Sequence, residues 1–167
     1  MKTGIRNLAK KLKQFGALSQ RDKGGLLLVF IILGLSRLIV LLLPMRFILP
    51  LLGNSNNKCM YCVCPTKHQI ETARHVRRIV NIAVKNMFFK PTCLVQAIAA
   101  RMLLGKQRIP YVFYLGVGLN SDKTLYAHAW VSTGPVFVTG GNGFTEYTVI
   151  ATFSNKGDYM TSFAGVE

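Results

Sequence analysis

The stretch Pro91–Gly105, PTCLVQAIAARMLLG, decides how the rest of the chain is interpreted. Pro91 cannot continue a preceding helix, and the Thr92 side chain can cap the free backbone N–H groups of a helix that begins after it. Gly105 is a typical helix stop. Between these ends, mostly apolar residues recur on one face with roughly helical spacing. That face consists of Leu94, Ala97, Ile98, Arg101, Met102 and Leu104.

Cys93 lies in the first turn of this predicted helix. Unpaired N–H groups and the positive end of the helix dipole favour an anion at that position, and so favour a thiolate, the nucleophilic form of cysteine. A buried, unreactive cysteine is the alternative. A histidine further along the chain, His128 in YAHAWV, favours the interpretation of Cys93 as a nucleophile.

Length and charge restrict the protein class. The chain has 167 residues, which suits one domain, and 21 basic residues against 6 acidic ones give a formal net charge of +15. Such a charge suits an anionic lipid surface or an acidic peptide. Aromatic residues are not interleaved with the basic ones, so we expect no nucleic-acid partner. The four cysteines do not suggest a disulfide scaffold, and we expect a cytoplasmic protein.

The N-terminal third combines a basic arm with an apolar segment. Residues 1–23 are basic and weakly amphipathic, which fits either a solvated arm or an interfacial helix. Residues 24–52 are the hydrophobic peak, and Arg37 lies near the middle of their apolar run. That length is close to a membrane span, at a cost of about 2.5–3.5 kcal/mol for the arginine. A helix packed on the domain, peripheral to the inner face of the membrane, is the preferred alternative.

A cysteine cluster follows the polar linker at residues 54–57. Cys59, Cys62, Cys64 and His68 are enough in number for a tetrahedral zinc site. Cys62 and Cys64 are separated by one residue only, and no second Cys-x-x-Cys pair completes a zinc motif. We therefore interpret them as incidental reduced cysteines and expect neither a metal nor a cofactor.

The remaining pattern predicts helices followed by strands. Residues 69–87 have apolar residues at helical spacing. After Gly105 the period changes, and residues 111–119, 124–131, 136–139 and 146–153 read as strands separated by turns. The predicted fold is α+β, with N-terminal helices followed by an antiparallel meander.

His128 can complete a catalytic pair if the helix that begins with Cys93 packs across this sheet. The two side chains would then act as nucleophile and general base. With Thr133 and Gly134 at a hairpin tip, Thr139 pairs directly with His128 and can accept a hydrogen bond from it. Asn142, in the loop just beyond, is the alternative third residue.

In order and spacing, these segments resemble the leader peptidases of lasso-peptide biosynthesis, the transglutaminase-like B proteins. The matching stretches run through residues 24–153. They are LLLPMRFILPLLG (41–53), PTCLVQAIAARMLLGKQRIPYVFYLGVG (91–118), LYAHAWVSTGPVFVTGG (125–141) and YTVIATF (147–153).

This resemblance implies a cysteine peptidase with a papain-like core that removes the leader from a ribosomally made precursor. Cys93 would attack the leader–core junction, and His128 would move the proton. The freed core would pass to an asparagine-synthetase-like cyclase, and a small leader-recognition protein would be a partner. Family members usually have an aspartate as third residue. Here that region reads VFVTGGN, which leaves Thr139 or Asn142.

The resemblance also suggests a division of the chain. Residues 1–53 would form the basic arm and apolar helix, and residues 54–167 the transglutaminase-like peptidase domain, unless one continuous domain begins at about residue 24. Two other functions stay open. One is a membrane-associated, non-catalytic peptide-binding protein, and the other is acyl transfer by the same Cys93–His128 pair.

Overall fold

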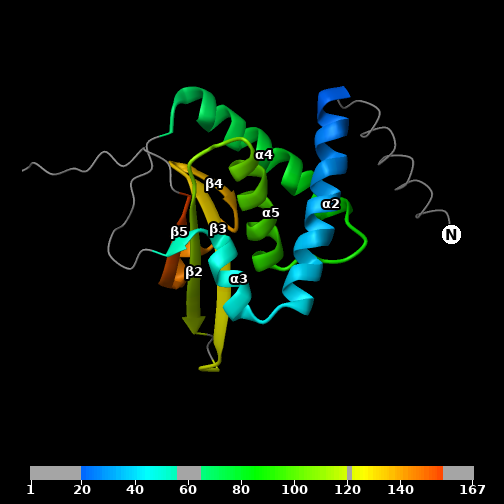
Figure 1. Ribbon diagram of the computed structural model, residues 1–167. Coiled ribbons are helices and arrows are strands. Elements are labelled where there is room, and N and C mark those ends of the chain that lie inside the picture. The colour runs from blue at the N-terminus through cyan, green and yellow to red at the C-terminus, as the bar shows by residue number, and fades with distance from the viewer. Residues whose placement is uncertain (1–19, 56–64, 120–121, 156–167) are drawn as a thin grey trace, which may run out of the picture.

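The computed structural model describes residues 20–55, 65–119 and 122–155, and in these ranges most helices precede the strands (Figure 1). The α+β fold predicted from the sequence is confirmed. The helices are α2 (Gln20–Leu42), α3 (Met45–Leu52), α4 (Lys67–Asn86), α5 (Cys93–Lys106) and the 3-10 helix η1 (Phe144–Glu146). The strands are β1 (Asn54–Ser55), β2 (Val112–Leu119), β3 (Leu125–Thr133), β4 (Val136–Thr139) and β5 (Thr148–Ser154).

The sheet is antiparallel throughout, and its strand order is β1-β5-β2-β3-β4. β2, β3 and β4 follow one another as the predicted meander. The prediction of a meander is wrong for the last strand, because β5 pairs with β2 and not with β4. Residues 140–147, the crossing segment, therefore pass from the β4 edge over β3 to reach β5. This segment brings new residues to the face that carries His128.

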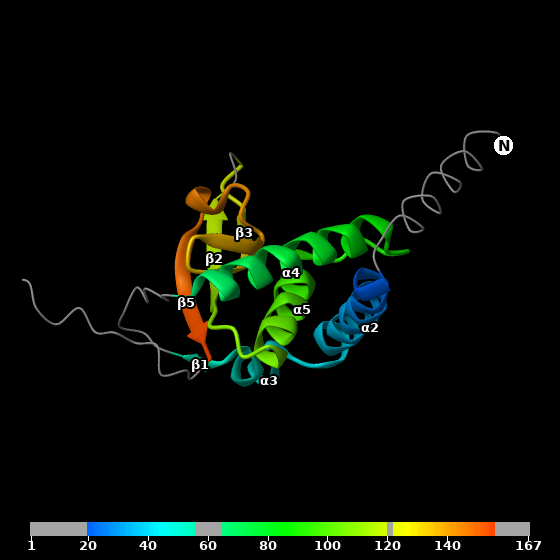
Figure 2. The ribbon, with the colours of Figure 1, turned by 90° about the horizontal axis from the view of Figure 1, so that it is seen from above.

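Helix α5 is the centre of the molecule. Figures 1 and 2 both show it between the sheet and α2, with α4 packed beside it. Its sequence explains this position, because small and branched apolar residues point to nearly every side of the helix and so allow close neighbours all round. The buried residues of α5 are Val95, Ala97, Ile98, Ala99, Ala100, Leu103 and Leu104.

Side-chain caps fix where the two central helices begin. Thr66 and Gln69 form a capping box at the start of α4, in which each side chain bonds to the backbone N–H of the other residue. Thr92 caps α5, as predicted. Helix α5 continues through Gly105 to Lys106, one residue beyond the predicted stop. Cys93 is thereby confirmed as the first residue of α5.

Helix α2 packs on the domain along one side. Leu26, Val29 and Leu33 are fully buried, and they belong to the same core as α4, α5 and the sheet. Residues 24–42 are also long and apolar enough to cross a membrane, and 28% of this stretch is buried. A mostly buried core helix of a soluble protein can have the same length and composition. The packing of Leu33 and its neighbours matches the packed-helix interpretation.

Two further expectations concern the segment after α3. The linker interpretation is wrong for Asn54 and Ser55, which pair with Ser154 and Phe153 as strand β1. Cys59, Cys62 and Cys64 lie outside the described residues, as do residues 1–19 of the basic arm.

The packing of α2 predicts different costs for the same substitution on its two sides. Leu33→Ala should lower the free energy of unfolding by about 2–5 kcal/mol, because Leu33 is fully buried and its loss leaves a cavity. Leu38→Ala, on the same helix, should change it by less than about 0.5 kcal/mol, because Leu38 is 52% exposed. Urea denaturation of both variants measures this, and equal small effects would show that α2 is not part of the folded domain.

Candidate active site

The N-terminus of α5 presents Cys93 with a free thiol. The Thr92 hydroxyl accepts a hydrogen bond from the Val95 N–H at 3.4 Å, and the Thr92 carbonyl accepts one from Gln96 N–H at 3.0 Å. The Cys93 side chain is half-buried against the core. As the first helical residue, Cys93 has a backbone N–H without an acceptor inside the helix. Cys93 therefore provides both a thiol and a backbone N–H donor at the helix N-terminus.

His128 projects from β3 and is fixed by a backbone acceptor. Its Nε2 lies 2.9 Å from the carbonyl oxygen of Gly140, in the crossing segment. A carbonyl oxygen can only accept, so Nε2 carries the proton in this bond. In the neutral ring, Nδ1 is then the nitrogen that can accept a proton. This is the arrangement that a general base needs.

Two aromatic rings, whose centroids are 6.1 Å from each other, pack against the imidazole. Tyr147 stacks on the His128 ring with centroids 4.6 Å apart and planes 25° from parallel. Trp130 stacks at 5.7 Å and itself stacks on Tyr114 at 5.3 Å. Trp130 is buried. These contacts leave the His128 ring little freedom to rotate.

Two glycines make this crowding sterically feasible. Gly116 pairs with His128 across β2 and β3, and a Cβ there would lie 2.8 Å from the Trp130 ring and 3.0 Å from Tyr147 Cβ. Gly140 has φ +67°, and its Cβ would lie 2.7 Å from the Ala129 carbonyl oxygen and 3.0 Å from His128 Nε2. Glycine is therefore required at both positions for the rings and the carbonyl to approach.

The electrostatic surroundings of Tyr147 include Cys93. Partial burial raises the pKa of the Tyr147 phenol above its usual value, and the charges of Tyr126, Cys93 and Glu146 raise it further, in that order. The Cys93 sulfur is thus within electrostatic reach of the ring that stacks on His128. The direct pairing of Cys93 with His128 stays a prediction.

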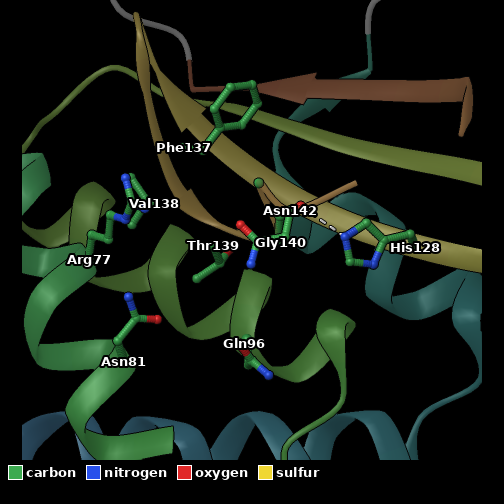
Figure 3. Close-up of a pocket in the computed structure, with 10 residues that line it drawn as sticks. Arg77, Asn81, Gln96, His128, Phe137, Val138, Thr139, Gly140 and Asn142 are labelled. Carbon is green, nitrogen blue, oxygen red and sulfur yellow. Dashed lines mark hydrogen bonds between the residues drawn. The ribbon is translucent and has the colours of Figure 1, made fainter. Parts of the chain in front are cut away.

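A cavity of about 340 Å³ lies beside His128 (Figure 3). Gln96 reaches it from α5, one turn after Cys93, while Arg77 and Asn81 border it from α4. Arg77 adds a positive charge, and none of the described lining residues is acidic. The rest of the lining comes from β4 and the crossing segment, namely Phe137, Val138, Thr139, Gly140, Gly141 and Asn142.

The structure places the proposed third residues near His128 without a bond to it. Thr139 pairs with Val131, so the expected pairing with His128 is wrong. The turn lies at Gly134 and Pro135, one residue later than expected, and the register shifts again after Val131. The Thr139 hydroxyl oxygen is buried without a hydrogen-bond partner. Asn142 lines the cavity and is exposed.

The Gln96 amide, one turn after Cys93, is a polar group of the kind that can hold an oxyanion. Its side-chain Nε2 donates to the Pro91 carbonyl at 2.8 Å, so this amide braces the entry into α5. The backbone N–H of Cys93 is therefore the better oxyanion donor at this helix terminus.

Sequence reasoning missed Gly140 and Tyr147. Tyr147 was read as part of a strand beside β4, which would have placed it away from His128. The two adjacent glycines in VTGGN were a usable signal. Glycine at the end of a strand often marks a position where the backbone lies close to another group. In the described ranges, no group of three or more His, Cys, Asp or Glu side chains could hold a metal ion.

Comparison with known proteins gives one match. The profile of the transglutaminase-like superfamily matches residues 39–152, which include α3 to β4, Cys93 and His128, and most of β5. No curated protein and no solved structure matches the chain.

The crowding at Gly140 predicts a site-specific cost for an added methyl group. Gly140→Ala should lower the free energy of unfolding by about 1–3 kcal/mol more than Gly143→Ala. Both glycines have positive φ, so the backbone strain is shared, but a Cβ at Gly143 meets only Glu146 carboxyl atoms at 3.6 Å or more. Urea denaturation gives the difference. NMR signals of the His128 ring should shift in the first variant only, and unmoved signals would contradict the contact.

Tyr147 should make stability depend on alkaline pH. Its folded-state pKa is raised, whereas an unfolded chain has a value of about 10. The folded protein therefore holds this proton more tightly, and the resulting stability is fully present below about pH 10 and lost as pH rises through the folded pKa. Urea midpoints measured across this range should fall less steeply in Tyr147→Phe than in the wild type. Parallel curves would contradict the assignment.

Proposed function

The chain belongs to the transglutaminase-like superfamily, which includes cysteine peptidase-like enzymes, and on this basis we propose that it is a cysteine peptidase. Its substrate would be a ribosomally synthesised precursor of a lasso peptide, cleaved between leader and core. The released core would then be closed by a separate macrolactam-forming cyclase. The motifs that resemble lasso-peptide leader peptidases support this choice of substrate.

One observation carries the proposal. Cys93 lies at a capped helix N-terminus, His128 has a fixed protonated Nε2, and the cavity beside His128 reaches Gln96, one turn after Cys93. A cysteine nucleophile requires a base and an oxyanion donor, and we propose that His128 and the Cys93 backbone N–H supply them. A purely structural cysteine requires neither.

The proposed reaction has two stages. The Cys93 sulfur attacks the carbonyl carbon at the leader–core junction, while Nδ1 of His128 takes the thiol proton. The oxyanion bonds to the backbone N–H of Cys93. His128 then protonates the leaving amine of the core, and a thioester to the leader remains. Water, deprotonated by His128, hydrolyses that thioester and restores the thiol.

The carbonyl of Gly140 takes the orienting role in this scheme. It accepts the His128 Nε2–H bond that a side-chain acceptor provides in other triads. A carbonyl has no formal charge, so its contribution is to fix the tautomer and the ring direction. Thr139 would then line the cavity without a role in proton transfer.

The cavity and the chain's net charge suggest the partners. Arg77 and the surplus of basic residues suit a leader with acidic side chains. A small leader-recognition protein would present the precursor, and the cyclase would take the product. We place these steps in the cytoplasm, at or near the inner face of the membrane.

A non-catalytic, membrane-associated peptide-binding protein is the second candidate. The exposed apolar residues of α2 favour membrane association in either case, so reactivity of the thiol separates the two functions. Alkylation of Cys93 by iodoacetamide at neutral pH should be fast and should slow in His128→Ala if the protein is the enzyme. An inert thiol in the folded protein would indicate the binding protein.

Activity is tested with a candidate precursor incubated with the protein and its leader-recognition partner, using mass spectrometry of the products. Cleavage at one junction should disappear in Cys93→Ala, which lacks the nucleophile. It should fall by about 10²–10⁴-fold in His128→Ala, which lacks the general base.

Thr139→Val is the matched control for the third position. It keeps the shape of the side chain and removes only the buried, unpartnered hydroxyl, so the cleavage rate should stay within about threefold and folding stability should not fall. A large loss of the cleavage rate would show that Thr139 is a third catalytic residue after all. Cleavage that survives Cys93→Ala would disprove the mechanism.

A further inference from the structure

The outer side of α2 and α3 is an exposed apolar surface. On α2 it contains Leu27, Ile31, Leu35, Leu38, Leu41 and Leu42, between 47% and 74% exposed. Their spacing of three or four residues places them on one side of the helix. On α3, Phe47 and Leu51 are about half exposed, at 52% and 47%. Surface leucines scattered singly are ordinary, but a continuous row of this length is not.

The loop after α4 extends this surface. Phe88 is 94% exposed, and it borders a shallow cavity of about 340 Å³ together with Phe30, Ile31 and Gly34 of α2. A phenylalanine so fully in contact with water is costly unless it has an apolar partner. We call this combined area of α2, α3 and Phe88 the apolar face.

The apolar face lies on the outer side of a helix that cannot leave the domain without loss of the core. Leu26, Val29 and Leu33 on the other side of α2 are fully buried. Arg37, in the C-terminal third of α2, sits 5.7 Å above the Phe89 ring centroid, in a cation–π contact. An α2 that crossed a bilayer would expose these core residues to lipid or water and would break this contact. The helix is thus built to lie along a surface.

Charge selects the kind of surface. Arg46 lies over the Phe47 ring at 4.8 Å, and Lys85 and Lys90 flank the loop that carries Phe88. All three basic residues are exposed, and residues 24–53 and 84–91 contain no Asp or Glu. With a net charge of +15, a second copy of the chain would be repelled, whereas anionic lipid headgroups would attract it.

We propose that the apolar face docks the protein in the plane of an anionic lipid bilayer. Apolar side chains of α2, α3 and Phe88 would enter the interfacial region, and Arg46, Lys85 and Lys90 would contact lipid phosphates. Figures 1 and 2 show the sheet on the other side of the helical layer from α2. Strand β3, which carries His128, therefore lies away from the bilayer in this orientation.

The test is flotation of the full chain with phosphatidylglycerol-containing vesicles and with pure phosphatidylcholine vesicles. We expect binding to the anionic vesicles to be at least tenfold stronger and to weaken as salt is added. Leu38→Glu with Leu42→Glu should reduce it tenfold or more. Phe88→Glu, in a loop rather than a helix, is a second variant that leaves α2 intact. It should also reduce binding to the anionic vesicles.

The matched control is a pair of equally exposed apolar residues on the sheet. Leu125 is 74% exposed and Ile150 is 60% exposed, and Leu125→Glu with Ile150→Glu adds the same charge away from the apolar face. This control should keep nearly the wild-type vesicle binding. Equal loss in both double variants, or no binding by the wild type, would overturn the proposal. So would light scattering that shows a dimer broken by Leu38→Glu with Leu42→Glu while vesicle binding is absent.

Discussion

The burial of α5 is the constraint on which the rest of the structure depends. Because nearly every side of this helix is apolar, it must be covered by the sheet, by α4 and by α2 together. The N-terminal turn, held by the Thr92 cap, is the part of the helix that presents a thiol and unpaired backbone N–H groups. Cys93 is therefore positioned by the whole core, and the proposed nucleophile needs no separate scaffold.

His128 depends on a different kind of constraint, the close approach of backbone to ring. The bond to the Gly140 carbonyl, the stacking of Tyr147 and the space left by Gly116 all require that side chains be absent at specific points. The orientation of the imidazole thus comes from main-chain geometry and aromatic packing. A carboxylate would add charge to this arrangement, but a direction for the ring is already supplied without one.

Much of the fold could be predicted from the sequence, because local signals decide it. Helical periodicity, the Thr92 cap and the alternating strands depend on neighbouring residues, and these predictions agree with the structure. Register and strand order depend on distant residues. A turn one residue later and an irregularity after Val131 moved Thr139 away from His128, and the choice of β2 as the partner of β5 moved Tyr147 toward it. No local pattern encodes either choice.

The route of the crossing segment has a consequence for how the site comes into being. The three strands β2, β3 and β4 are neighbours in sequence and can pair early, whereas β5 must return past them to reach β2. Tyr147 directly precedes β5, so it is held against His128 only when that last strand has joined. A nascent chain still threaded in the ribosome beyond β4 would carry both Cys93 and His128 but would not yet hold the imidazole in position. Pairing of β5 would therefore have to precede any reaction that depends on a fixed imidazole.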